Sequence, residues 1–166
     1  MKILNYDRKK AIKYAKAWVY SRNPNYYNFD NTGGDCTNYI SQCIYTGCRV
    51  MNYQKEIGWY YNSLDDRAPA WTSAKYLYNF LIRNMGVGPY GHKVLQDKID
   101  IGDIVQFKFD KEYFSHSAII VEIQARNNLD KILVASHSID AFNKRVSSYK
   151  FSDIRFIHIE KVRSYW

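Results

Sequence analysis

The spacing of apolar and polar positions changes about halfway along the chain. Up to residue 84, apolar residues recur every three or four positions, which is the spacing of an amphipathic helix. After residue 101, short runs of β-branched and aromatic residues alternate with turn residues, as strands do. Helices followed by a strand meander predict an α+β fold with N-terminal helices packed on an antiparallel sheet.

Three helices are expected in the first half, from caps and stop signals at their ends. They run from the cap Asp7 to Tyr20, from Cys36 to Thr46 with Gly47 as the stop, and from Thr72 to Asn84. The segment 49–71 is expected to be an irregular connection. Gly88-Pro89 and Gly91 are then expected to break the chain.

The second half predicts four strands. They cover Ile104–Phe109, Ser115–Ile123, Lys131–Ser136 and Phe156–Lys161. The connection over residues 124–130 is short enough to join antiparallel neighbours. Because no repeat, low-complexity segment or linker interrupts the chain, we expect a single domain over residues 1–166.

Composition narrows the class of protein. The chain has 166 residues, of which 46% are hydrophobic, enough for a sizeable core. No apolar run approaches about 18 residues, so no membrane span is expected. Residues 1–10 lack the apolar stretch of a signal peptide, which favours a cytoplasmic location or release by a non-classical route.

The charge is strongly basic and uneven. The net charge is +8, and the first 22 residues carry seven Lys and Arg against a single Asp. Such an excess favours anionic partners such as an acidic wall polymer, but a solvated helix face is the simpler explanation. No nucleic-acid motif accompanies the charge, so nucleic acid is not an expected partner.

The three cysteines are an odd number, which argues against a disulfide framework. Their spacing lacks the close pairs of a structural zinc site, and four ligands are not evident. Cys43 and Cys48 are expected to be small core residues. Asp30, Asn31 and Asp35 do not follow the spacing of a calcium loop. We therefore expect neither a metal nor an organic cofactor.

Cys36 differs from the other cysteines because it follows the turn Gly33-Gly34-Asp35 and opens the second predicted helix. Unpaired N–H groups and the positive end of the helix dipole lie at such a position. This environment is expected to lower the thiol pKa and to favour a nucleophilic thiolate. A buried structural cysteine is the alternative.

Two histidines are placed to meet this thiol. His116 opens the second predicted strand and His137 closes the third, so antiparallel pairing is expected to bring both rings to one face and one end of the sheet. Cys36 would attack a carbonyl, His116 would act as acid and base, and His137 would orient His116. Asp140 competes with His137 for this orienting role.

The oxyanion of such a reaction needs hydrogen-bond donors. The backbone N–H of Cys36 is one candidate, because it lies at the start of a helix. Asp35 and Tyr27 in the preceding loop, together with Asp140, are further candidates for oxyanion or substrate binding. Structural explanations remain open for each histidine, as a surface strand residue or a turn residue.

Several segments, in the same order along the chain, resemble the bacterial putative amidase domain family, a branch of the NlpC-type papain-like cysteine hydrolases. The segments are Tyr6-Asp-Arg-Lys-Lys-Ala-Ile-Lys-Tyr-Ala, Asn25-Tyr-Tyr-Asn-Phe-Asp, Gly33-Gly-Asp-Cys-Thr-Asn-Tyr-Ile-Ser-Gln, Gly58-Trp-Tyr-Tyr, Gly102-Asp-Ile-Val-Gln-Phe, His116-Ser-Ala-Ile-Ile-Val and Ser136-His-Ser-Ile-Asp. The segments around Cys36, Gly102 and His116 are the most specific.

The resemblance implies a papain-like fold, with Cys36 as nucleophile, His116 as base and His137 at the third position. It also implies hydrolysis of an amide or peptide bond, often in cell-wall peptides. Acyl transfer by the same residues is an alternative activity. A binding module that keeps the scaffold with an idle triad is an alternative of another class.

Overall fold

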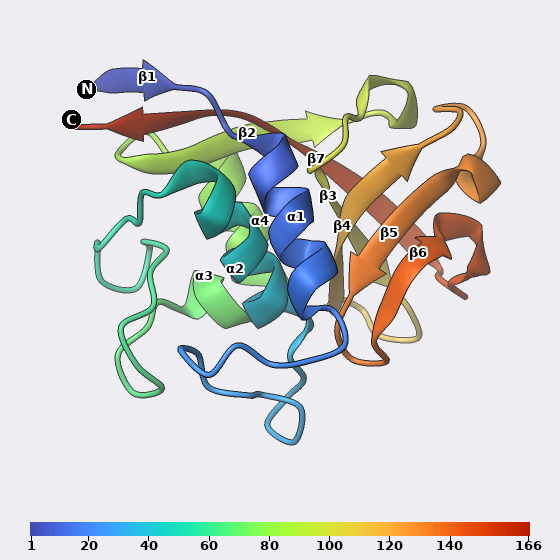
Figure 1. The fold of residues 1–166 in the computed structure, drawn as a ribbon, viewed down its shortest axis with the longest axis horizontal. Helices are drawn as coiled ribbons and strands as arrows, with labels where there is room; N and C mark the ends of the chain where they lie inside the picture. Colours follow the sequence, from blue (N-terminus) through green and yellow to red (C-terminus); the bar gives the residue numbers. More distant parts are fainter.

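The structure, a computed structural model, describes residues 1–166 as helices packed on a seven-stranded sheet (Figure 1). The helices are α1 (Arg8–Trp18), α2 (Cys36–Cys48), α3 (Pro69–Thr72) and α4 (Ala74–Arg83). The strands are β1 (Lys2–Leu4), β2 (Gly88–Val94), β3 (Ile104–Lys108), β4 (His116–Ile123), β5 (Ile132–Ser136), β6 (Ala141–Arg145) and β7 (Asp153–Ser164). The strand order is β1-β7-β3-β4-β5-β6, β2 also pairs with β7, and every pairing is antiparallel. The predicted α+β class is confirmed.

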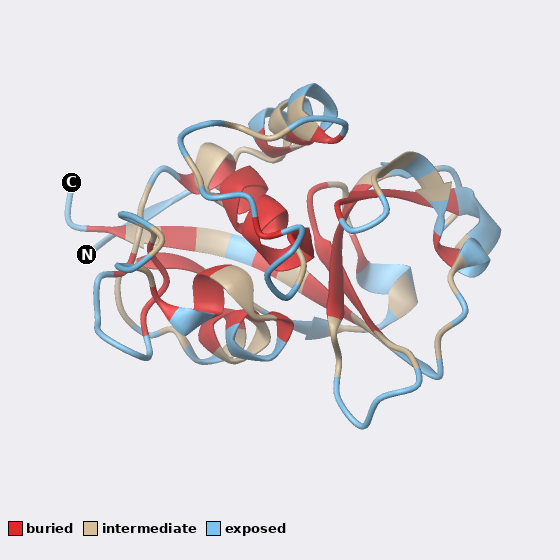
Figure 2. Cartoon of the chain, turned by 90° about the horizontal axis from the view of Figure 1, so that it is seen from below, coloured by how far each residue is buried: buried red, intermediate tan, exposed pale blue.

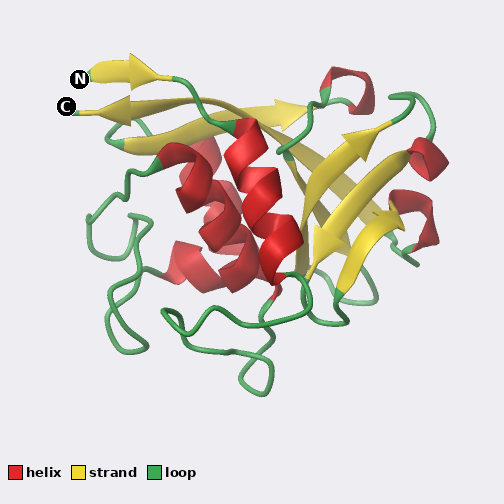
Figure 3. Ribbon diagram, in the orientation of Figure 1, coloured by secondary structure: helices red, strands yellow, loops and turns green.

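The sheet carries a separate apolar cluster on each face. On one face, Ile104, Ile119 and Ile157 join the helices in the larger cluster. On the other face, Val105, Phe107 and other strand residues that point away from the helices form a smaller cluster with the segment after β6. Figure 3 shows the helices gathered against one side of the sheet.

Helix α1 follows its prediction closely. The Asp7 side chain accepts a hydrogen bond from the Lys10 backbone N–H at 3.0 Å and caps the helix. Ala11 and Ala15 are buried against the core, while Lys13 points to solvent. The apolar stripe of the sequence is therefore the packed face of this helix.

Helix α2 is buried on nearly all sides, because α1, α3 and the sheet surround it (Figure 2). It runs through Gly47 to Cys48, so the predicted stop at Gly47 is wrong. Glycine stands here because a side chain would collide with the Tyr6 ring and the Asp7 carbonyl. The helix ends where Arg49 adopts a left-handed conformation, with φ of 60°, and donates its N–H to the Tyr45 carbonyl.

Substituting Gly47→Ala is expected to lower the free energy of unfolding by about 1–3 kcal/mol, because an added Cβ overpacks the site. That Cβ would lie 2.5 Å from Tyr6 Cε2 and 2.8 Å from the Asp7 carbonyl oxygen. Gly86→Ala is the matched control, since its Cβ would meet nothing closer than 3.4 Å. Equal urea midpoints for the two variants would contradict this packing argument.

Three strands of the sheet were not predicted. Residues 88–94 form β2, which contradicts the expected break, and β1 and β6 were not anticipated. Gly91 permits β2 because its bare Cα lies directly against the His158 carbonyl of β7. Strand β7 is twelve residues long, since β1, β2 and β3 all pair with it.

The third predicted helix, residues 72–84, is observed as α4 over residues 74–83, and a short separate helix, α3, precedes it. Pro69 begins the short α3, and Ser73 is extended, with φ of −115° and ψ of 126°. The Ser73 hydroxyl then accepts from the Tyr76 N–H and caps α4. The connection predicted to be irregular, residues 49–71, contains the isolated bridges Asn52–Trp59 and Tyr61–Arg67 and, at its end, most of α3.

Candidate active site

Cys36 is the first residue of α2 and lies next to the first residues of β4. The N-terminal end of α2 meets the start of β4 and the end of β5 at one edge of the molecule (Figure 1). The Cys36 sulfur lies 3.8 Å from Thr37 Oγ1 and 3.9 Å from the Ser115 carbonyl oxygen. The thiol therefore touches the residue that precedes His116, but it makes no hydrogen bond to either imidazole.

Burial sets the ionisation of this thiol. It raises the pKa of Cys36, and the Ser117 backbone N–H and the Thr37 hydroxyl only partly oppose the shift. The neighbouring Asp35 charge raises the pKa further. The expected thiolate is therefore contradicted for the resting site, because loss of solvent outweighs the helix terminus.

His116 lies in an aromatic pocket. Its ring packs against Phe107, Phe109 and Tyr149, with centroids 5.6–6.0 Å away. Burial, assisted by the positive charge of Lys144, lowers the pKa of His116 to about 4. Its Nε2 is the one buried side-chain nitrogen or oxygen in residues 1–166 without a hydrogen-bond partner. A buried polar atom of this kind is rare and requires an explanation.

His137 is held by other partners. Its Nδ1 lies 2.6 Å from Asp35 Oδ2, and its Nε2 lies 2.9 Å from the Trp18 carbonyl oxygen and 3.1 Å from Arg22 Nη1. The ring also stacks on Tyr39 of α2, with centroids 3.9 Å apart. Both ring nitrogens are thus occupied by groups other than His116.

The strand register separates the two histidines. Ile119 pairs with Ala135, and continuing this antiparallel register places His137 opposite Ser117. His137 therefore shares the face of α2, whereas His116 lies on the face of Phe107 and Tyr149. The expectation that both rings share one face is wrong, because the pairing is offset by one residue from the one assumed.

Arg22 ties the loop before α2 to the turn after β5. Its guanidinium makes paired hydrogen bonds of 2.9–3.1 Å to both oxygens of Asp30 and both oxygens of Asp140. In the same turn, the Ser138 hydroxyl accepts from the Asp35 N–H at 3.0 Å. Asp140 is thus paired with Arg22 and does not orient His116 by a hydrogen bond.

No pattern in the sequence pointed to Arg22 or Ser138. Arg22 stands in a turn before Pro24, where a polar residue is unremarkable. Ser138 and Ile139 adopt φ values of 60° and 52°, which β-branched residues such as Ile rarely do. Backbone strain of this kind gathers at functional sites when the surroundings enforce it.

The two remaining candidates have defined positions. Asp35 Oδ1 accepts from the Phe29 N–H and from Asn38 Nδ2, both at 2.9 Å, and its side chain makes no capping hydrogen bond to the backbone of α2. Tyr27 is 40% exposed, and its backbone carbonyl accepts from Asn38. Neither side chain hydrogen-bonds to the Cys36 sulfur.

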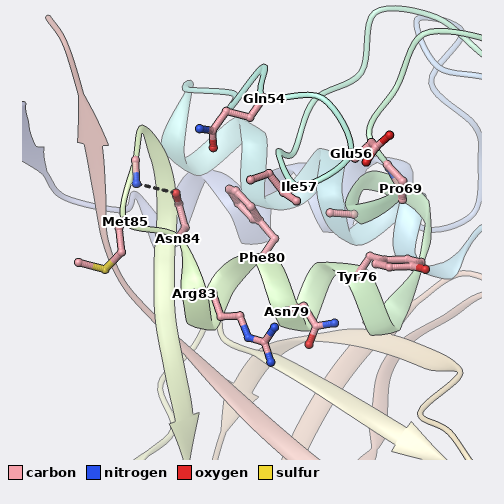
Figure 4. Close-up of a pocket in the computed structure, with 12 residues that line it drawn as sticks. Gln54, Glu56, Ile57, Pro69, Tyr76, Asn79, Phe80, Arg83, Asn84 and Met85 are labelled. Carbon is pink, nitrogen blue, oxygen red and sulfur yellow. Dashed lines mark hydrogen bonds between the residues drawn. The ribbon is translucent and has the colours of Figure 1, made fainter.

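Two cavities lie away from Cys36. One, of about 780 Å³, separates α4 from the loop over residues 54–57, and Figure 4 shows Tyr76, Asn79, Phe80 and Arg83 along its α4 side. The other, of about 590 Å³, lies beside Trp166. Nowhere in residues 1–166 do three His, Cys, Asp or Glu side chains gather to hold a metal ion. No helix has the length and apolar character needed to cross a membrane.

The pKa of His116 predicts a pH dependence of stability. Because burial holds this pKa near 4 in the folded state, against 6.5 for the free side chain, the unfolded chain binds more protons between these values. Stability is therefore lost as the pH falls from 6.5 to 4, by up to about 3 kcal/mol. His116→Phe, which suits the aromatic pocket, should remove this part of the dependence. Urea unfolding at pH 7 and pH 4 measures it, and identical pH dependence of the two proteins would contradict it.

Sequence comparison with known proteins identifies the family of this chain. The family profile described as "Putative amidase domain" matches residues 5–159. The chain is also similar to the uncharacterized protein YhbB of Bacillus subtilis (strain 168), with 29% identity over 158 residues, 89% of this chain and 46% of the relative. The chain thus spans about half the length of that relative. No solved structure matches the chain. Since the profile covers nearly all of it, the chain belongs to the putative amidase domain family, whose description indicates amidase activity in general terms.

Proposed function

We propose that the protein is a cysteine-dependent amidase in which Cys36 is the nucleophile and His116 the general base. The observation that carries the proposal is the unpartnered Nε2 of His116. This buried nitrogen belongs to the residue between Ser115, whose carbonyl contacts the Cys36 sulfur, and Ser117, whose N–H favours its thiolate. Proton transfer from the thiol requires an unoccupied ring nitrogen that can be brought to the sulfur.

The reaction starts from two neutral groups. Cys36 is a thiol and His116 an uncharged imidazole near pH 7, because burial shifts their pKa values apart. The sulfur attacks the amide carbonyl as its proton passes to His116. The imidazolium then protonates the leaving amine, which leaves a thioester on Cys36. His116 next removes a proton from water, the resulting hydroxide attacks the thioester and releases the acid, and the imidazolium returns its proton to the sulfur to restore the thiol.

This mechanism requires His116 to turn. In the resting structure, no hydrogen bond joins its ring to the Cys36 sulfur, and Phe107 and Tyr149 hold the ring on the opposite face. Catalytic hydrogen bonds often form only in the substrate complex. We infer that a bound substrate draws the imidazole toward the sulfur as it enters.

The oxyanion of the tetrahedral intermediate has one available donor. The backbone N–H of Cys36 is at the first position of α2 and has no acceptor in the protein. One such donor contributes about 10²–10³ in rate. The carboxylates Asp35 and Asp140 are acceptors and do not serve this role, since His137 and Arg22 already occupy them.

His137 acts as a positioning residue in this account. Through Asp35 and Tyr39 it fixes the first turn of α2, and with it the direction of the Cys36 side chain. This role replaces the orienting hydrogen bond to His116 that a triad would supply.

The papain-like arrangement of NlpC-type hydrolases and a cell-wall peptide substrate are part of the same proposal. Support comes from the cysteine at a helix start, the histidine at a strand start and the family profile. Acyl transfer is the second candidate, because the thioester would accept an amine as readily as water.

The test is turnover of short wall-derived peptides in H₂¹⁸O, followed by mass spectrometry. Hydrolysis predicts a new amine and a new acid that carries one ¹⁸O. Transfer predicts a product joined to an added amine and no ¹⁸O. Absence of both products across the peptide set, with the protein folded, would favour the non-catalytic binding module.

A further inference from the structure

A row of polar side chains crosses the sheet beneath the start of α2. Gln106 of β3 pairs with Ser117 of β4 on one side and with Arg155 of β7 on the other. Residues two positions along each of these strands, Ile104, Ile119 and Ile157, belong to the apolar cluster on this face. Polar groups in such surroundings lower stability unless they are paired, so their partners are informative.

The row is joined by hydrogen bonds that end at the candidate nucleophile. Arg155 donates from Nε at 2.9 Å and from Nη2 at 2.6 Å to Gln106 Oε1. Gln106 Nε2 donates to Ser117 Oγ at 3.1 Å, and Ser117 Oγ lies 3.0 Å from Thr37 Oγ1. Thr37 Oγ1 is in turn 3.8 Å from the Cys36 sulfur.

Arg155 itself carries an unused positive charge. None of the ion pairs of the chain involves it, and its Nη1 has no hydrogen-bond partner. Nη1 is also not among the buried unpartnered atoms, so it touches solvent. The guanidinium is clamped between the Tyr78 and Phe114 rings, 3.6 Å and 4.1 Å from their centroids. A planar cation held rigidly with one free edge suits a carboxylate.

The free side of the Arg155 guanidinium lies on the same face of the sheet as the start of α2, where Cys36 stands. Phe114 immediately precedes Ser115, whose carbonyl contacts the sulfur. Arg155 and Ser117 are separated by β3, which is two strand spacings or about 10 Å. An extended peptide covers about 3.3–3.6 Å per residue, so this gap corresponds to two or three residues.

We propose that Arg155 binds a carboxylate of the substrate and makes the Cys36 site selective for acidic peptides. The substrate class is a peptide whose carboxylate lies two or three residues from the cleaved amide. This inference rests on the proposed function, since it assigns a specificity to that same site. Tyr78 and Phe114 hold the guanidinium between their rings. Gln106 Oε1 accepts hydrogen bonds from Nε and Nη2, which leaves Nη1 free to bind the substrate carboxylate.

The test uses two alkylating peptides that differ only in charge. Iodoacetyl-Ala-Ala ends in a carboxylate, and its C-terminal amide is neutral. At pH 8, where Arg155 is charged because its pKa is lowered only to about 10, the rate of Cys36 labelling is measured by mass spectrometry. We expect the acid to label Cys36 about five to ten times faster than the amide, from a charge-assisted hydrogen bond at a half-buried site. Equal rates would overturn the proposal.

Variants test whether Arg155 causes the faster labelling by the acidic peptide. Arg155→Gln should make the two rates equal, whereas Arg83→Gln, which removes another arginine without an ion pair, should keep the preference. Because Arg155→Gln loses support for Gln106, Arg155→Lys is the second variant, and its preference should fall below half the wild-type value. A full preference in either folded Arg155 variant would overturn the assignment.

The outcome is separable from that of the proposed function. Alkylation needs the thiol but no amide cleavage. A protein labelled with acid preference that cleaves no peptide would refute the amidase and leave the carboxylate site standing. A protein that cleaves peptides but shows no acid preference in either assay would support the amidase and refute the carboxylate site.

Discussion

Replacing Cys36 by alanine is expected to reduce kcat/KM for amide cleavage by at least about 10⁴, because removal of a nucleophile eliminates the covalent pathway. The change should leave the fold intact, since the thiol makes only contacts of 3.8–3.9 Å with its polar neighbours. Peptide cleavage followed by mass spectrometry measures the loss. Cys36→Ser is a companion variant, and it should be almost as inactive, because an alcohol has a much higher pKa than a thiol and gives up its proton to an imidazole less readily.

The control is Cys48→Ala at the far end of α2. Cys48 is also buried and free, and burial raises its pKa to about 12, but it lies beside Val50 and away from His116. Its variant should retain activity within severalfold while folded. Unchanged cleavage by Cys36→Ala would remove the thiol from the mechanism.

The largest effect on stability is expected from Asp35→Ala, about 3–5 kcal/mol of unfolding free energy. The Asp35 side chain is 1% exposed and accepts from His137, Asn38 and the Phe29 N–H. Its removal leaves these donors buried without an acceptor and frees the first turn of α2. Asp35→Asn should cost less, since an amide oxygen still accepts from two of them.

Urea unfolding at pH 7 measures this loss. Asp65→Ala is the matched control, because Asp65 is exposed and makes no hydrogen bond or ion pair. The free energy of unfolding of Asp65→Ala should lie within about 0.5 kcal/mol of the wild-type value. If Asp35→Ala were as stable as that control, His137 would not anchor α2 in the way described.

The predictable part of the fold is the part that local chemistry decides. Asp7 caps α1 and Cys36 opens α2 because turn and cap signals act over a few residues. Gly47 and Gly91 were misread as breaks, since their role is set by Tyr6 and His158, which are distant in the sequence. A glycine required for close packing and a glycine that ends an element look alike in a sequence.

The candidate site shows the same division. The sequence selected Cys36, His116 and His137, and the structure places all three around one end of the sheet. Their faces depend on a pairing register that alternation alone does not determine, and one residue of offset reverses the face. The burial that raises the pKa of Cys36 also comes from tertiary packing, which a helix-terminus argument omits.

The most direct test of the account is an acid-quenched reaction of the wild-type protein with a cleavable peptide, analysed by intact mass and peptide mapping. The account predicts an acyl adduct on Cys36 that forms in wild type, forms at least about 100-fold more slowly in His116→Phe, and is absent from Cys36→Ala. Cleavage that proceeds with no adduct, or an adduct that forms as fast without the His116 imidazole, would contradict it.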